Sequence, residues 1–166
     1  MCLPNFERFE QISKDSPLIG YRSWRNKKES LDLKSENQEY IWVPVVTGPH
    51  EVLEFNSGIY AYYNYYNNAY YNYYNNNYYN YNNYYNNYNN NIGGIILQYG
   101  KVAIHREGQR SEFAKIDKLL LIREEDAQGS KEFLNWIKKF NIHVKQIAER
   151  YEAFTISWQD FKESKK

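Results

Sequence analysis

The segment from Ile92 to His105, IGGIILQYGKVAIH, contains two apolar runs on either side of Gln98-Tyr99-Gly100. Aliphatic and β-branched residues in runs of this length are typical of buried strands. We expect one bent strand or a pair of strands here. After it, the charged residues from Arg106 to Arg110 around Gly108 are expected to form a turn, and Leu119–Ile122 a short buried strand.

Shorter strands are expected on both sides of this segment. Leu18–Arg25 (LIGYRSWR) combines aromatic and apolar residues that suit a pleated surface. Further strands are predicted at Ser30–Lys34, at Tyr40–Val46, from Ser57–Ala61 onward, and at Phe154–Trp158. At the two ends, the spacing of Phe6, Phe9 and Ile12 indicates a short helix or packed arm within Met1–Ser16, and Lys162–Lys166 reads as a solvated tail.

Between Ser130 and Tyr151 the pattern of apolar residues changes. They recur at three- and four-residue steps, at Phe133, Ile137, Phe140, Val144, Ile147, Ala148 and Tyr151. This spacing predicts one amphipathic helix, with Ser130 as its N-cap. Consecutive short strands followed by a helix predict an α+β fold, with a small, mostly antiparallel sheet or partly open barrel and one long C-terminal amphipathic helix.

From Tyr60 to Asn91 every residue is Tyr or Asn except Ala61 and Ala69. The tract has no charge, proline or glycine and no pattern that would segregate a buried face. We therefore expect a disordered Tyr/Asn-rich insertion, residues 60–91, within a single domain spanning residues 1–166. It is either a repeat expansion in an AT-rich genome, since Tyr and Asn codons differ by one base, or a self-associating segment.

Composition narrows the classes of function. The chain has 21 basic and 20 acidic residues, a net charge of +1, which disfavours extended duplex DNA binding. Cys2 is the only cysteine, so we expect neither a disulfide nor a thiolate metal site. No phosphate-binding loop, dinucleotide fingerprint, signal peptide or membrane span is recognisable, so we expect a cytoplasmic protein without a cofactor, away from the membrane.

Four residues are candidates for a site that binds a ligand or a partner. His105, Arg110 and Glu112 lie within eight residues and could orient one another or hold an anion. The alternative is a charged hairpin with a surface ion pair worth at most about 1 kcal/mol. Arg22 shares a strand face with Trp24, an arrangement that can bind single-stranded nucleic acid but is more often a core indole beside a solvated arginine.

Several motifs occur in a fixed order along the chain: GYRSWR (20–25), WVP (42–44), GIYA (58–61), and His105, Gly108, Arg110, Glu112 and Ala114 in the spacing His-x-x-Gly-x-Arg-x-Glu-x-Ala. In these motifs the chain resembles a group of uncharacterised, mainly bacterial proteins. The resemblance implies a shared fold unit and raises the standing of the His/Arg/Glu cluster, and it implies no activity. Where that group has cysteine before GIYA, this chain has residues such as Asn56 and Ser57.

The sequence favours a non-enzymatic binding or interaction module for an unknown small anionic ligand or protein partner. The alternative is a small hydrolase or nuclease-like enzyme, with His105 as general base, Glu112 orienting it and Arg110 stabilising an anion. A third hypothesis assigns the function to the Tyr/Asn tract, through self-association.

Overall fold

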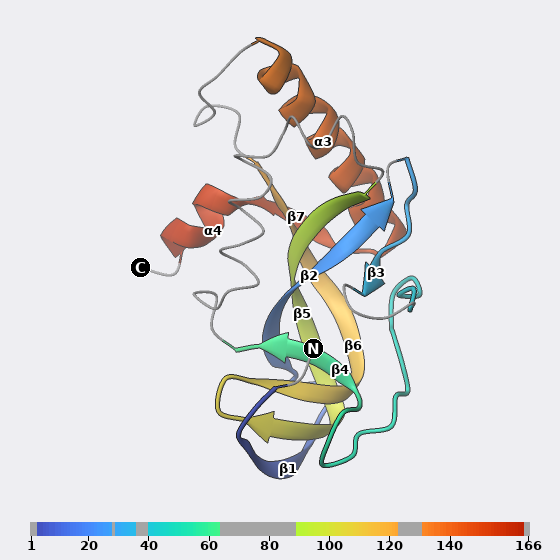
Figure 1. The fold of residues 1–166 in the computed structure, drawn as a ribbon, viewed down its shortest axis with the longest axis vertical. Coiled ribbons are helices and arrows are strands. Elements are labelled where there is room, and N and C mark those ends of the chain that lie inside the picture. The colour runs from blue at the N-terminus through green and yellow to red at the C-terminus, as the bar shows by residue number, and fades with distance from the viewer. Residues whose placement is uncertain (1–2, 28, 36–39, 64–88, 123–130, 165–166) are drawn as a thin grey trace.

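A computed structural model describes residues 3–27, 29–35, 40–63, 89–122 and 131–164. In these ranges the chain forms seven strands and two helices (Figure 1). The strands are β1 (Phe6–Ile12), β2 (Leu18–Lys27), β3 (Lys34–Ser35), β4 (Ile59–Tyr62), β5 (Asn89–His105), β6 (Gly108–Leu121) and β7 (Phe154–Ser157). The helices are α3 (Lys131–Arg150) and α4 (Trp158–Ser164).

All seven strands belong to one sheet. Their order is β1-β5-β2-β4-β6-β7, with β3 paired to β2. Neighbours are antiparallel except β6 and β7, which are parallel. Because β5 also pairs with β6, the strands β5, β2, β4 and β6 are joined in a circuit, and β1, β3 and β7 extend the sheet from it.

The predicted α+β fold with a small, mostly antiparallel sheet or partly open barrel is wrong. The structure is mostly sheet, and the sheet is large and mixed. The cause is strand length. The two apolar runs of 92–105 form one strand, β5, which continues through Gly100 at a φ of +84°. Most of the predicted turn and the short strand after it belong to the 14-residue β6.

Three predicted strands are confirmed as β2, β4 and β7, and two other predicted strands are wrong. Ser30–Lys34 contributes only Lys34 to β3, and Tyr40–Val46 forms only an isolated bridge between Ile41 and Lys34. Val45 has a φ of +73°, which a β-branched residue rarely adopts and which interrupts any longer ladder. Of the two alternatives for the N-terminal segment, the packed arm is the one found: the segment forms strand β1, which pairs with the edge of β5.

The predicted disordered tract, residues 60–91, is described by the structure only at its two ends. Its ends belong to the sheet, as β4 extends to Tyr62 and β5 begins at Asn89. Residues 64–88, and the predicted N-cap Ser130, lie outside the described residues. The predicted solvated tail, Lys162–Lys166, begins within α4, which extends to Ser164, and Glu163 is exposed there.

The predicted amphipathic helix is present as α3, which lies at the end of the sheet opposite β1 (Figure 1). Its buried face joins a core that includes Trp24, Trp42 and Trp136, each no more than 2% exposed. Two polar contacts fix the helix. The Asn141 amide accepts from the Ile122 amide at 2.9 Å and donates back to the Ile122 carbonyl, and the Tyr151 hydroxyl donates to the Trp42 carbonyl at 2.7 Å.

A buried polar network cross-links the four strands of the circuit. Gln98 Nε2 donates to the Ile59 carbonyl at 2.8 Å and to Ser111 Oγ at 3.0 Å. Gln109 Nε2 donates to Gln98 Oε1 at 2.8 Å and to the Ile19 carbonyl at 3.0 Å. These side chains are at most 4% exposed, so their mutual hydrogen bonds offset the cost of burying them.

Candidate binding pocket

A cavity of about 210 Å³ lies beside the His105–Arg110 region. Its walls are the N-terminal segment Leu3–Phe6 and the loop segment Glu54–Asn56, and it is completed by Tyr60, His105 and Arg110. Two of the four residues predicted for a site therefore line one cavity. The wall residues around them were not predicted, because segments about fifty and a hundred positions away in the sequence supply them.

The two wall segments turn at asparagines. Asn5 has a φ of 60° and Asn56 a φ of 57°, in the left-handed region that asparagine tolerates better than most residues. The Asn5 carbonyl accepts from the Arg106 amide at 3.2 Å, and Asn5 Nδ2 donates to Glu107 Oε1 at 3.1 Å. The first wall is thereby tied to the β5–β6 turn.

His105 and Arg110 form a buried pair, 3% and 1% exposed. Arg110 Nε donates to His105 Nε2 at 3.0 Å, and His105 Nδ1 lies 3.1 Å from the Pro4 carbonyl. Both contacts require one tautomer, in which Nδ1 carries the proton and Nε2 is an acceptor. The imidazole is therefore neutral in this arrangement, and its basic nitrogen faces a guanidinium.

Electrostatics favour the same neutral state. Burial, the largest effect, lowers the pKa of His105 below its usual value, and the Arg110 charge lowers it further. The Pro4 carbonyl and the carboxylates of Glu7 and Glu107 act in the opposite direction.

The Arg110 guanidinium connects the second wall to the sheet. Nη1 donates to the Ser57 carbonyl and Nη2 to the Glu54 carbonyl at 2.7 Å, while the ring centroid of Tyr60 lies 5.8 Å from Cζ. Gly58, with a φ of +92°, brings the loop close, since a Cβ there would lie 3.1 Å from the Ser111 carbonyl oxygen. Arg110 therefore holds the loop segment against β6.

The other two predicted site residues do not line the cavity. Glu112 Oε1 accepts from the backbone amide of Lys101 at 3.0 Å, and no contact between Glu112 and His105 is found within the described ranges. Arg22 Nη1 donates to the Tyr60 carbonyl at 3.1 Å, and its Cζ lies 4.7 Å from the Trp42 ring centroid. The indoles beside Arg22 are buried, which favours the core alternative over nucleic acid stacking.

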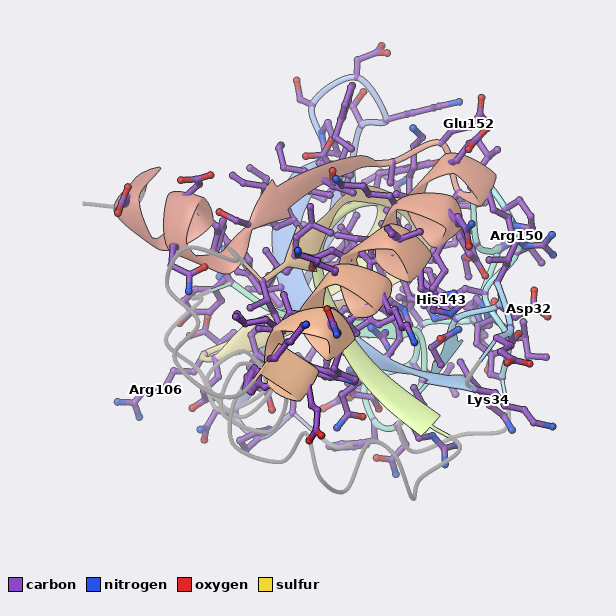
Figure 2. All side chains as sticks on the ribbon, turned by 90° about the horizontal axis from the view of Figure 1, so that it is seen from above. Asp32, Lys34, Arg106, His143, Arg150 and Glu152 are labelled. Carbon is purple, nitrogen blue, oxygen red and sulfur yellow. The ribbon has the colours of Figure 1, made fainter. Side chains whose placement is uncertain are left out.

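The remaining histidines lie elsewhere. His50 Nε2 is 2.6 Å from the Tyr40 hydroxyl, and burial lowers the pKa of His50 and raises that of Tyr40. His143, labelled on α3 in Figure 2, has its Nε2 2.9 Å from Oδ1 of Asn26, which lies near the end of β2. Neither histidine lines the cavity.

Within the residues that the structure describes, no three His, Cys, Asp or Glu side chains are grouped to hold a metal ion. None of the helices in those ranges is long and apolar enough to cross a membrane.

The pocket is a small cavity with apolar walls beside His105 and Arg110, whose side chains bind each other and nearby backbone carbonyls. Leu3, Pro4, Phe6, Phe55 and Tyr60 give it apolar or aromatic walls. Comparison with protein-family models, with curated proteins and with solved structures found no match, so what can be said of function comes from this geometry.

Proposed function

We propose that this protein is a non-enzymatic binding module that docks onto a protein partner by receiving one apolar side chain of that partner in the pocket. The observation that carries the proposal is a small apolar cavity with exposed apolar residues on its rim. Phe55, which lines the cavity, is 69% exposed, and Leu53, two positions earlier in the loop, is 51% exposed.

The size of the cavity favours a side chain over a whole metabolite. Pockets for drug-sized ligands measure about 300–1,000 Å³, and this one is about 210 Å³. A nucleotide or larger cofactor would leave much of its surface outside. A single side chain of a partner fits this volume, and exposed apolar residues at the rim then add buried area on contact.

The geometry lends no support to catalysis by His105. A general base needs a lone pair within reach of a substrate proton, and the Nε2 lone pair of His105 accepts from Arg110. The role of orienting the imidazole, predicted for Glu112, falls to the Pro4 carbonyl. Arg110 likewise donates to protein acceptors, which favours a partner side chain over a small anion as the occupant.

The test is a heteronuclear NMR titration with N-acetyl-phenylalanine amide and N-acetyl-leucine amide, alongside sodium phosphate and sodium acetate. We expect the two amides to shift the backbone resonances of Tyr60 and His105 in a saturable manner, and the two anions to leave them in place. Saturable shifts from phosphate, with none from the amides, would replace the proposal with an anion site.

A matched pair of variants locates the effect. Phe55 and Phe154 are almost equally exposed, at 69% and 71%, and only Phe55 lines the cavity. Phe55→Ser is expected to weaken the binding of the two amides, and Phe154→Ser is expected to leave that binding unchanged. Equal losses in both variants would mean that the amides bind to exposed aromatic surface in general.

A further inference from the structure

The charges around the pocket identify the kind of partner that it fits. Among the described residues that line the pocket, Arg110 is the one cation, and its guanidinium is directed at the carbonyls of Glu54 and Ser57 and at His105. A side chain that is 1% exposed and occupied in this way presents little positive charge to an incoming molecule.

The mouth of the pocket is acidic. Glu54 lines it and is exposed, and within the described part of the chain its carboxylate makes no ion pair. Glu107 is engaged within the protein, since its Oε1 accepts from Asn5 Nδ2 at 3.1 Å and its Oε2 is buried. Glu7, which follows the wall residue Phe6, is exposed. Both carboxylates lie close enough to His105 to act on its pKa.

Within the described residues, the arginines that are close in sequence to the pocket walls do not pair with Glu54. Arg8 lies 3.6 Å from Glu7 and 2.7 Å from Glu10, so its charge is shared on the exposed edge of β1. Arg106 follows His105 in sequence, but its side chain points away from the body of the protein (Figure 2). The loop segment from His50 to Ser57 carries Glu51 and Glu54 and no lysine or arginine.

We infer that the partner segment carries its apolar anchor beside basic residues, so that the anchor enters the pocket while a Lys or Arg meets Glu54. This inference rests on the proposed function, because the anchor must first occupy the pocket. Complementary charge at the rim steers encounter and excludes wrong partners, and the buried anchor supplies most of the affinity.

Three peptides with the same anchor test the inference: acetyl-Lys-Phe-Lys-amide, acetyl-Gly-Phe-Gly-amide and acetyl-Glu-Phe-Glu-amide, titrated by NMR at low and at physiological salt. We expect affinity to fall in that order, by about two- to fivefold per charge. The advantage of the basic peptide should shrink as salt is added, since the Debye length is about 8 Å at 0.15 M.

Variants assign the effect to the acidic mouth. Glu54→Gln is expected to lower the affinity for the basic peptide and to leave the affinity for the neutral peptide unchanged. Glu149→Gln, on the exposed side of α3, should alter neither affinity. If the basic and neutral peptides bind equally, or if Glu54→Gln changes nothing, the charge inference is overturned and the pocket proposal stands. If no peptide binds at any charge, the proposed function itself fails.

Discussion

At the scale of single residues, burial determines what Arg110 does. An arginine in a His/Arg/Glu cluster suggests a group that holds an anion, but this one is 1% exposed and donates to three acceptors of the protein itself. Those acceptors belong to β5 and to the loop segment before β4. Arg110 therefore connects parts of the chain that are distant in sequence, and the pocket depends on that connection.

Arg110→Ala is expected to lower the free energy of unfolding by about 3 kcal/mol, because one buried and two partly buried acceptors lose their donor, at about 1–3 kcal/mol for the buried one and less for each of the others. Arg106→Ala, at an exposed position on the turn, should stay within about 0.5 kcal/mol of the parent. Urea unfolding followed by tryptophan fluorescence measures both. An Arg110→Ala variant as stable as Arg106→Ala would refute the structural role of Arg110.

The sequence could place His105 and Arg110 near each other because only four residues separate them. It could not supply Pro4, Glu54 or Ser57, whose contacts depend on strand order and loop path. Glu112 was grouped with the pair on proximity in sequence. The register between β5 and β6 shifts between Tyr99 and Val102, next to the Lys101 amide to which Glu112 binds.

At the scale of elements, α3 ends in a Schellman motif built without glycine. The Ala153 amide donates to the Ala148 carbonyl at 2.8 Å and the Glu152 amide to the Glu149 carbonyl at 3.2 Å, with Glu152 at a φ of 54°. Figure 2 shows Glu152 at this end of the helix, near the exposed Arg150–Asp32 ion pair of 3.0 Å. In this left-handed conformation a residue with a side chain has a higher backbone energy than glycine.

Glu152→Gly is therefore expected to raise the free energy of unfolding by about 0.5–1 kcal/mol, because it removes backbone strain and keeps both hydrogen bonds. Glu149→Gly, three residues earlier within the helix, should lower it by a similar amount. Thermal unfolding by circular dichroism compares the two. Destabilisation by both glycines would mean that the Glu152 side chain contributes more than the strain that it imposes.

The connection from β4 to β5 is a crossover between parallel strands. Both strands are antiparallel to β2, which lies between them, and Tyr62 pairs with Tyr21 whereas Asn89 pairs with Lys27. The chain must therefore advance by about 20 Å along β2 and pass two strand spacings of about 4.8 Å each. This requirement holds whatever the origin of the Tyr/Asn tract.

Replacing residues 64–88 with a Gly/Ser linker of 14 residues is expected to preserve the fold, whereas a linker of four residues should prevent it. Four residues reach at most about 18 Å between the flanking residues, less than the span required, and crossovers generally need a dozen residues or more. Circular dichroism and amide dispersion by NMR report the outcome. A folded four-residue variant would contradict the assigned strand pairing.

If the tract serves only as a connection, the four-residue variant should be the only one of the two that changes the behaviour of the protein. If the 14-residue variant folds but loses a self-association that the parent shows, the tract itself drives assembly, because the crossover is intact in that variant. The long linker is thus the control for the short one and the test of assembly through the tract.

At the scale of the whole molecule, sequence patterns identified the long helix and several strands but underestimated the sheet. The charged and apolar residues of β6 alternate too irregularly to be recognised as one strand, and their regular pairing is imposed by β5 and β4 on either side. The α3 face was predictable because its periodicity is local, whereas strand order follows from tertiary contacts over long separations.

Acid should destabilise the molecule before its carboxylates titrate. Burial lowers the pKa of all three histidines, His50, His105 and His143, below the ordinary value of about 6.5. Between the folded and unfolded pKa values the unfolded chain binds more protons, so stability is complete above about pH 6.5 and declines as the pH falls through the folded values. Unfolding free energies should stay level from pH 7.5 to about 6.5 and decrease from there to pH 5.5. His143→Gln, whose amide can still donate to Asn26 Oδ1, should give a shallower profile, and a profile parallel to that of the parent would show that His143 takes no part in the decline.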